Sequence, residues 1–237
     1  MSRPSDAQKR TEMMNHWLLN TAVEFPVSII YFFPKVSQAL NVKPMPGCTS
    51  EDYARGLIGL FDLGMITFSS KTPGDDTANR AGILQILKRF QELPIEDGTL
   101  PSYKRLRLSG MEVAFKLTTL GGEAWEKLAQ PDWARYVSTS LLPARSGDLI
   151  SADRDLLFAY MEWYPEVNRE QIQLETIRWQ EHTDFKIVYW KRLPFVYHAS
   201  FEVTPAESRW VNGQPKWFSD WWISTCSWHK QPWDLPG

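Results

Sequence analysis

The sequence predicts an α+β protein in two parts: an α-rich N-terminal domain followed by a small antiparallel β-sheet domain with a helix. Over much of residues 12–129, apolar residues recur at steps of three and four, the period of an amphipathic helix. Over residues 185–203, the pattern changes to the alternation of a half-buried strand. The 237 residues are 43% hydrophobic and 23% charged, which is typical of a globular protein with a real core.

A segment rich in turn residues marks the predicted domain boundary. Residues 138–150 combine serines and a threonine with Pro143 and Gly147, a composition typical of a loop. We therefore predict a winged-helix-like α-rich domain over 1–137, a linker over 138–150, and a Trp-rich antiparallel β domain over 151–237.

The N-terminal elements begin with a polar segment, residues 1–11, which we interpret as a loose arm. A helix is expected from Glu12, and Pro26 ends or kinks it because proline lacks a backbone N–H. Residues 27–33 fit either a strand or a helix. Their β-branched and aromatic content favours a strand, and their position between helical patterns favours a buried helix.

The next helix carries recognisable start and stop signals. Thr49 is a capping residue with Asp52 three positions later, and Gly64 stands where a C-terminal glycine belongs. A short strand is predicted over 65–68, and another amphipathic helix over 81–93.

The remaining elements follow in order. A strand is predicted over 113–117, and Thr118 or Thr119 then caps a helix that runs to about residue 129. Ser151 or Asp153 starts a helix of the second domain.

Two alternating runs then predict strands, residues 185–190 and 195–203, with Leu193-Pro194 as the tight connection between them. Asn212-Gly213 is a hairpin turn signal.

Two segments of the N-terminal domain carry a family resemblance. Residues 56–66, Gly-Leu-Ile-Gly-Leu-Phe-Asp-Leu-Gly-Met-Ile, resemble the winged-helix segment in which a helix ends in leucine, three residues and glycine before a strand. Residues 115–121, Phe-Lys-Leu-Thr-Thr-Leu-Gly, resemble the wing strand of that family and the start of its following helix. The resemblance covers residues 12–130. It implies a domain that reads DNA or serves as a protein-interaction module.

The composition and the absence of motifs argue against several functions. The formal net charge of −2 gives no sign of a nucleic-acid or anionic-membrane partner. The sequence contains no P-loop, no dinucleotide fingerprint and no nucleophile elbow. Cys48 and Cys226 are far apart, which favours reduced thiols over a zinc or redox site. We expect a cytoplasmic protein that is not an enzyme, has no cofactor or metal, and does not bind a membrane.

DNA binding is the alternative that the winged-helix resemblance suggests first. In the helix over 51–63, Arg55 is the one cation among three carboxylates, so its exposed side would repel phosphate. A wing-like basic cluster exists at Lys104, Arg105 and Arg107. A transcription regulator would need that cluster beside the helix.

An enzyme or metal site is the third hypothesis. His182 and Asp184 stand before one predicted strand, and His198 and Glu202 lie on one face of the next. A metal needs two imidazoles and a carboxylate to converge on one point, and an ordinary polar sheet face would show the same pattern.

Tryptophan is the strongest compositional signal. Of 12 tryptophans in the chain, nine lie after residue 160. Trp217-Phe218 and Trp221-Trp222 are adjacent pairs, and on a strand one member of each pair would face outward. The leading prediction is therefore a non-enzymatic protein that binds another protein, of the inhibitor, immunity or adaptor type. Its predicted binding residues are Trp217, Trp221 and Trp222, because tryptophan is enriched at such surfaces.

Overall fold

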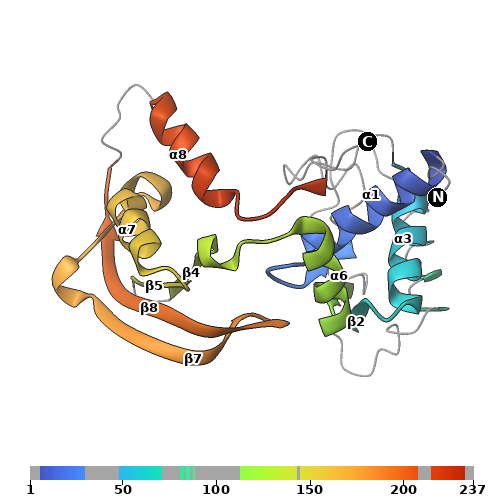
Figure 1. The fold of residues 1–237 in the computed structure, drawn as a ribbon, viewed down its shortest axis with the longest axis horizontal. Helices are drawn as coiled ribbons and strands as arrows, with labels where there is room; N and C mark the ends of the chain where they lie inside the picture. Colours follow the sequence, from blue (N-terminus) through green and yellow to red (C-terminus); the bar gives the residue numbers. More distant parts are fainter. Residues whose placement is uncertain are drawn as a thin grey trace. The chain divides into compact units, whose positions relative to one another are not determined.

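The computed structural model describes residues 6–29, 48–70, 113–142, 145–207 and 215–232, together with residues 81, 82, 84, 85 and 88. Helices occur together with two antiparallel sheets, of three and five strands, which confirms the α+β class (Figure 1). The chain divides into two compact units. Unit 1 consists of two segments, Met1–Ala129 and Gln231–Gly237. Unit 2 is Gln130–Lys230.

In the described part of unit 1, three helices of more than ten residues accompany a small sheet. The elements are α1 (Asp6–Thr21), β1 (Val27–Ser28), α3 (Ser50–Asp62), β2 (Ile66–Ser70), β3 (Val113–Leu117) and α6 (Thr119–Ala129). The strand order is β1-β3-β2, so β3 pairs with both neighbours. The helix predicted from Glu12 begins earlier, at Asp6, and the predicted arm is therefore partly helical.

The helix starts of unit 1 follow the capping signals of the sequence. Thr49 and Asp52 form a complete capping box at the start of α3. Thr118, one of two candidates, caps α6, because its Oγ accepts the Gly121 N–H at 3.1 Å. The Thr118 hydroxyl also donates to the Gly64 carbonyl at 2.7 Å, which joins the start of α6 to the end of α3. Gly64 itself has φ +69°, a conformation that favours glycine.

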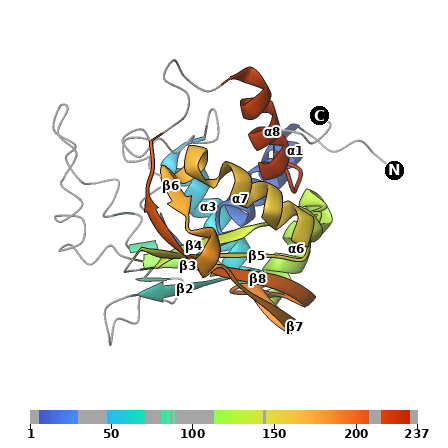
Figure 2. The same ribbon diagram turned by 90° about the vertical axis from the view of Figure 1, so that its left-hand side faces the viewer.

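Unit 2 is a sheet covered by helices. Its elements are η3 (Trp133–Arg135), β4 (Ser138–Leu142), β5 (Ser146–Ser151), α7 (Arg154–Asn168), β6 (Glu170–Ile172), η4 (Leu174–Thr176), β7 (Arg178–Val188), β8 (Lys191–Pro205) and α8 (Lys216–Cys226). The path of the sheet is β4-β5-β8-β6, and β7 also pairs with β8. The views of Figures 1 and 2 agree that α7 lies between the sheet and α8.

The core of unit 2 lies between α7 and one face of the sheet. It is a cluster of buried residues from β5, α7, β6 and β8: Leu149, Leu157, Tyr160, Met161, Tyr164, Ile172, Ala199, Phe201 and Val203. Because strand residues alternate between faces, the neighbours of the core positions point to the sheet face away from α7. We call that surface the far face.

Three predictions for this unit are wrong. Residues 138–150 are not a linker: β4 and β5 pair as a hairpin that belongs to the sheet. Leu193-Pro194 lies inside β8, and the turn between β7 and β8 is at residues 189–190. Trp217–Trp222 lie on helix α8 and not on a strand.

Other predictions are only partly covered. Of the helix predicted over 81–93, the five described residues are helical. Most of the open segment 27–33 and the hairpin signal Asn212-Gly213 lie outside the described residues, apart from β1 and Ile29.

Candidate functional site

The predicted partner-binding tryptophans meet a fourth one from α7. The indole of Trp163 lies 5.1 Å from that of Trp217 and 6.0 Å from that of Trp221, measured between ring centroids. The Phe218 ring stands between them, 5.4 Å from Trp163 and 5.7 Å from Trp221. We call Trp163, Trp217 and Trp221 the aromatic ridge, with Phe218 as its base.

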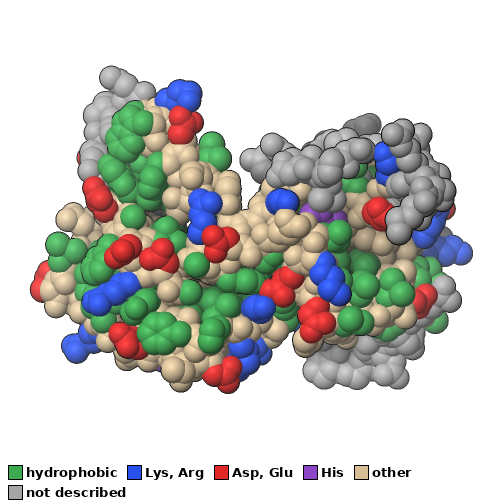
Figure 3. All heavy atoms as spheres, in the orientation of Figure 1, with side chains coloured by type: hydrophobic (Ala, Val, Ile, Leu, Met, Phe, Trp, Pro, Cys, Tyr) green, Lys and Arg blue, Asp and Glu red, His purple; other side chains and the backbone are tan. Residues whose placement is uncertain are grey.

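The base of the ridge is buried, and the ridge itself is partly exposed. Phe218 is 2% exposed and Trp217 is 54% exposed. The rings of Trp163 and Trp221 are half-buried. Figure 3 shows hydrophobic side chains gathered over α8. An indole that is half in water, held by edge-on ring contacts, offers apolar surface in a fixed position.

Trp222 packs on the core of unit 2, unlike its neighbour Trp221 on the ridge. Its ring lies 5.5 Å from that of Tyr160, and it packs against the core of unit 2. On a helix, residues four apart lie on the same side, so Phe218 and Trp222 turn toward α7 while Trp217 and Trp221 form the flank. Of the three predicted binding residues, Trp217 and Trp221 are brought together on the ridge and Trp222 serves packing.

A second aromatic cluster accounts for other tryptophans. The ring centroid of Trp133 lies 5.8 Å from that of Trp190, edge-on, and 5.0 Å from that of Trp228, tilted. Tyr136 lies 4.6 Å from Trp228, which is itself 7% exposed. Tyr136 and Trp228 are buried, and Trp133 and Trp190 are half-buried, so this cluster packs part of unit 2.

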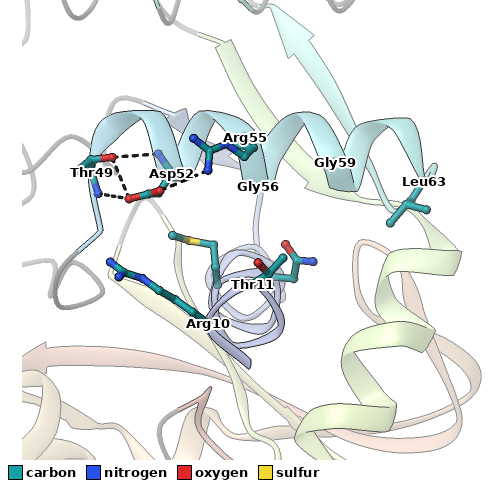
Figure 4. Close-up of a pocket in the computed structure, with 10 residues that line it drawn as sticks. Arg10, Thr11, Thr49, Asp52, Arg55, Gly56, Gly59 and Leu63 are labelled. Atoms are coloured by element: carbon teal, nitrogen blue, oxygen red, sulfur yellow. Dashed lines mark hydrogen bonds and ion pairs between the residues drawn. The ribbon is translucent and has the colours of Figure 1, made fainter. Parts of the chain in front are cut away.

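Arg55, the helix cation of the DNA-binding alternative, lines a groove in unit 1. It encloses about 570 Å³ between α1 and α3 (Figure 4). Arg10 lines it from α1 and Arg55 from α3. Two hydrogen bonds from Thr49 to the Asp52 carboxylate, with smaller contributions from both arginines, lower the Asp52 pKa. Asp52 is thus held as an anion between the cations, 3.9 Å from Arg55, and this opposes phosphate binding.

The DNA-binding alternative also names a basic cluster on the wing-like segment. Lys104, Arg105 and Arg107 lie outside the described residues. The side chain of Arg55 is 77% exposed.

Of the four residues in the histidine hypothesis, the structure brings two together. His182 Nε2 lies 3.2 Å from His198 Nδ1, so β7 and β8 bring the two imidazoles together. Asp184 points elsewhere: it accepts from Arg192 at 2.7 Å, and that hydrogen bond lowers the Asp184 pKa. Glu202 donates its backbone N–H to the Thr176 hydroxyl oxygen, and the residue is exposed.

Sequence reasoning missed two members of this group. Asp148 accepts a hydrogen bond from His198 Nε2 at 3.0 Å, and the Ser140 hydroxyl donates to the other Asp148 oxygen at 3.2 Å. Both residues lie in the segment predicted as a linker. The sequence therefore predicts no strand pairing that would put them beside His198. Among the described residues, no three His, Cys, Asp or Glu side chains are grouped as a metal site.

Comparison with known proteins gives no relative. No family model matches the chain, and no curated protein or solved structure matches it. Within the described part of the chain, no helix has the length and apolar character needed to cross a membrane.

Proposed function

We propose that this protein binds another protein through the aromatic ridge of unit 2, as an inhibitor, immunity protein or adaptor. The observation that carries the proposal is Trp217, which is 54% exposed although it is held against Trp163 and Phe218. An ordered indole loses little side-chain freedom on binding, which is why tryptophan dominates binding hot spots.

The surroundings of the ridge indicate the chemistry of the partner. The rim of α8 carries the exposed ion pair Lys216–Asp220, whose Nζ and Oδ2 atoms are 2.6 Å apart. An apolar centre with a charged rim is the usual arrangement of a protein interface. The expected partner segment places an apolar or aromatic side chain against Trp217 and Trp221.

The experiment compares two exposed positions of the same unit. A photo-crosslinking phenylalanine analogue is placed at Trp217 or, as the matched control, at Leu174, which is 73% exposed on η4. After irradiation in the native host, position 217 is expected to give an adduct with one protein and position 174 none. Equal adducts at both positions, or a chain of this same protein in the adduct, would contradict a heterologous partner at the ridge.

Binding of the identified partner gives the quantitative test. Trp217→Ala is expected to weaken it at least about 10-fold, the effect of a hot-spot residue, and Leu174→Ala to leave it unchanged. The melting temperature of Trp217→Ala is expected to stay close to that of the wild type, because most of this side chain is already in water.

DNA binding by unit 1 is the second candidate, and one observation favours it. The strands of the winged-helix resemblance pair as β2 with β3, Ile66 opposite Leu117, directly after α3. Such a function predicts a gel shift that weakens steeply with salt and that Arg55→Ala weakens further. The carboxylates Glu51, Asp52 and Asp62 on α3 make it the less favoured of the two.

A further inference from the structure

Four polar side chains form a chain of hydrogen bonds across the far face of the sheet. It runs from Ser140 to Asp148, from Asp148 to His198, and from His198 to His182. The strands β4, β5, β8 and β7 each contribute one member. The chain thus crosses four neighbouring strands of unit 2.

The strand register explains why these residues meet. Ser140 is directly opposite Asp148, and Asp148 is opposite Ser200, two residues from His198. His198 is opposite Gln180, two residues from His182. Side chains two residues off a direct pair are diagonal neighbours on one face and are within reach of long side chains. The adjacent residues Leu149 and Ala199 point into the core, so the chain lies on the face turned away from it.

The hydrogen bonds set the tautomer of His198. An ionised carboxylate can only accept, so the His198 Nε2 carries the proton toward Asp148. A neutral imidazole then has its lone pair on Nδ1, and this is the atom that faces His182 Nε2. A carboxylate behind one nitrogen and an available lone pair at the other is the arrangement found around metal-ligating histidines.

The spacing of the two facing nitrogens matches that of neighbouring ligands on one ion. Tetrahedral Zn²⁺ with nitrogens at about 2.0–2.1 Å separates adjacent ligand atoms by about 3.3 Å. The observed separation between His182 Nε2 and His198 Nδ1 is 3.2 Å. The side chains of His198 and Asp148 are 20% and 19% exposed, so the site is open to solvent and partly shielded from it.

We propose that His182 and His198 form a two-histidine site for a divalent transition-metal ion on the far face, with Asp148 orienting His198 and water completing the coordination shell. The ion takes the place of the hydrogen bond between the rings, in which His182 Nε2 is the donor. When the ion binds His182 Nε2, the proton of the neutral ring is carried on Nδ1 instead. Imidazole ligands select zinc, nickel and copper over the hard ions magnesium and calcium. The described residues supply no third His, Cys, Asp or Glu, which leaves positions open for exchangeable ligands.

Calorimetric titration of the untagged, chelator-treated full chain with Zn²⁺ tests the site. One ion per chain is expected for the wild type, and no such binding for His182→Ala or His198→Ala. Asp148→Asn is expected to weaken Zn²⁺ binding about 10–100-fold, because outer-shell partners of ligating histidines have effects of this size. Mg²⁺ is expected not to bind.

His229→Ala is the matched control, since it also removes a histidine of unit 2 but one that bonds to the Lys230 carbonyl. Equal Zn²⁺ binding by the wild type and His182→Ala, or no stoichiometric binding by the wild type, would overturn the proposal. Should a variant fail to fold, nuclear resonance of the wild-type histidine rings decides: Zn²⁺ is expected to shift the ring signals of His182 and His198 and not those of His229. Unmoved His182 and His198 signals would refute the site.

Discussion

Two glycines of unit 1 have very different surroundings, and they make a matched pair. A Cβ built on Gly121 would lie 1.9 Å from the carbonyl oxygen of Met65. That oxygen accepts the Thr118 N–H at 3.0 Å, so the two segments cannot separate without losing this bond. A Cβ on Gly59, inside α3, meets nothing within 4 Å.

We therefore expect opposite effects from the same substitution. Gly121→Ala should lower the free energy of unfolding by about 1–3 kcal/mol or more, the cost of overpacking. Gly59→Ala should raise it by up to about 1 kcal/mol, because alanine is the better helix former. Urea unfolding followed by tryptophan fluorescence measures both, and similar values for the two variants would contradict the close approach at Gly121.

Tyr164 predicts a loss of stability in alkali. Burial in the core of unit 2, with the nearby Glu170 carboxylate, raises the Tyr164 pKa to about 12. In the unfolded chain tyrosine releases its proton near pH 10. Between these values the unfolded state binds fewer protons than the native state, so the free energy of unfolding falls as the pH rises.

The variant Tyr164→Phe removes this titration. Its free energy of unfolding should fall less between pH 10 and 12 than that of the wild type, and the two pH dependences should run parallel below pH 9. Denaturant titrations at a series of pH values give the comparison. Parallel curves across the whole range would show that Tyr164 does not keep its proton on folding.

The tryptophans of helix α8 contribute unequally to the stability of unit 2. Trp222 packs on Tyr160 and the core of unit 2, whereas Trp217 is 54% exposed. Trp222→Ala should therefore lower the free energy of unfolding by about 2–4 kcal/mol, and Trp217→Ala by less than about 1 kcal/mol. Thermal unfolding by circular dichroism separates them. A larger loss of unfolding free energy for Trp217→Ala than for Trp222→Ala would show that Trp217 is a core residue and not an exposed binding residue.

How far the sequence predicts elements depends on whether the signal is local. The capping residues Thr49 and Asp153 gave correct helix starts, because a cap is a contact within four residues. The residues of α8 are predicted on a strand and form a helix instead, in which Phe218 and Trp222 pack toward α7. The β4–β5 hairpin is predicted as a linker, because its serines and proline are typical of a loop.

The candidate sites follow the same rule. Trp217, Trp221, His182 and His198 could be named from composition and alternation. Asp148 could not, because its contact with His198 spans 50 residues and depends on the register of β5 with β8. The ridge member Trp163 could likewise not be predicted, since it reaches Trp217 from another helix.

At the scale of the whole molecule, unit 2 is closed by contacts between its own ends. The Asp132 N–H donates to the Trp228 carbonyl at 2.7 Å, and the rings of Trp133 and Trp228 are 5.0 Å apart. Lys230 Nζ also donates to the Gln130 side chain. All strands of the five-stranded sheet and their core cluster lie within Gln130–Lys230.

We therefore expect residues 130–230, produced alone, to fold as an independent unit with cooperative thermal unfolding and a near-ultraviolet dichroism signal from its ordered tryptophans. A fragment that stops at residue 226 keeps every strand and all of α8 but lacks Trp228. Because Trp228 is 7% exposed against Trp133 and Tyr136, this shorter fragment should lose about 3–5 kcal/mol of unfolding free energy. Equal stability of the two fragments would mean that the aromatic cluster does not close the unit. A longer fragment without cooperative unfolding would mean that unit 2 needs unit 1 to fold.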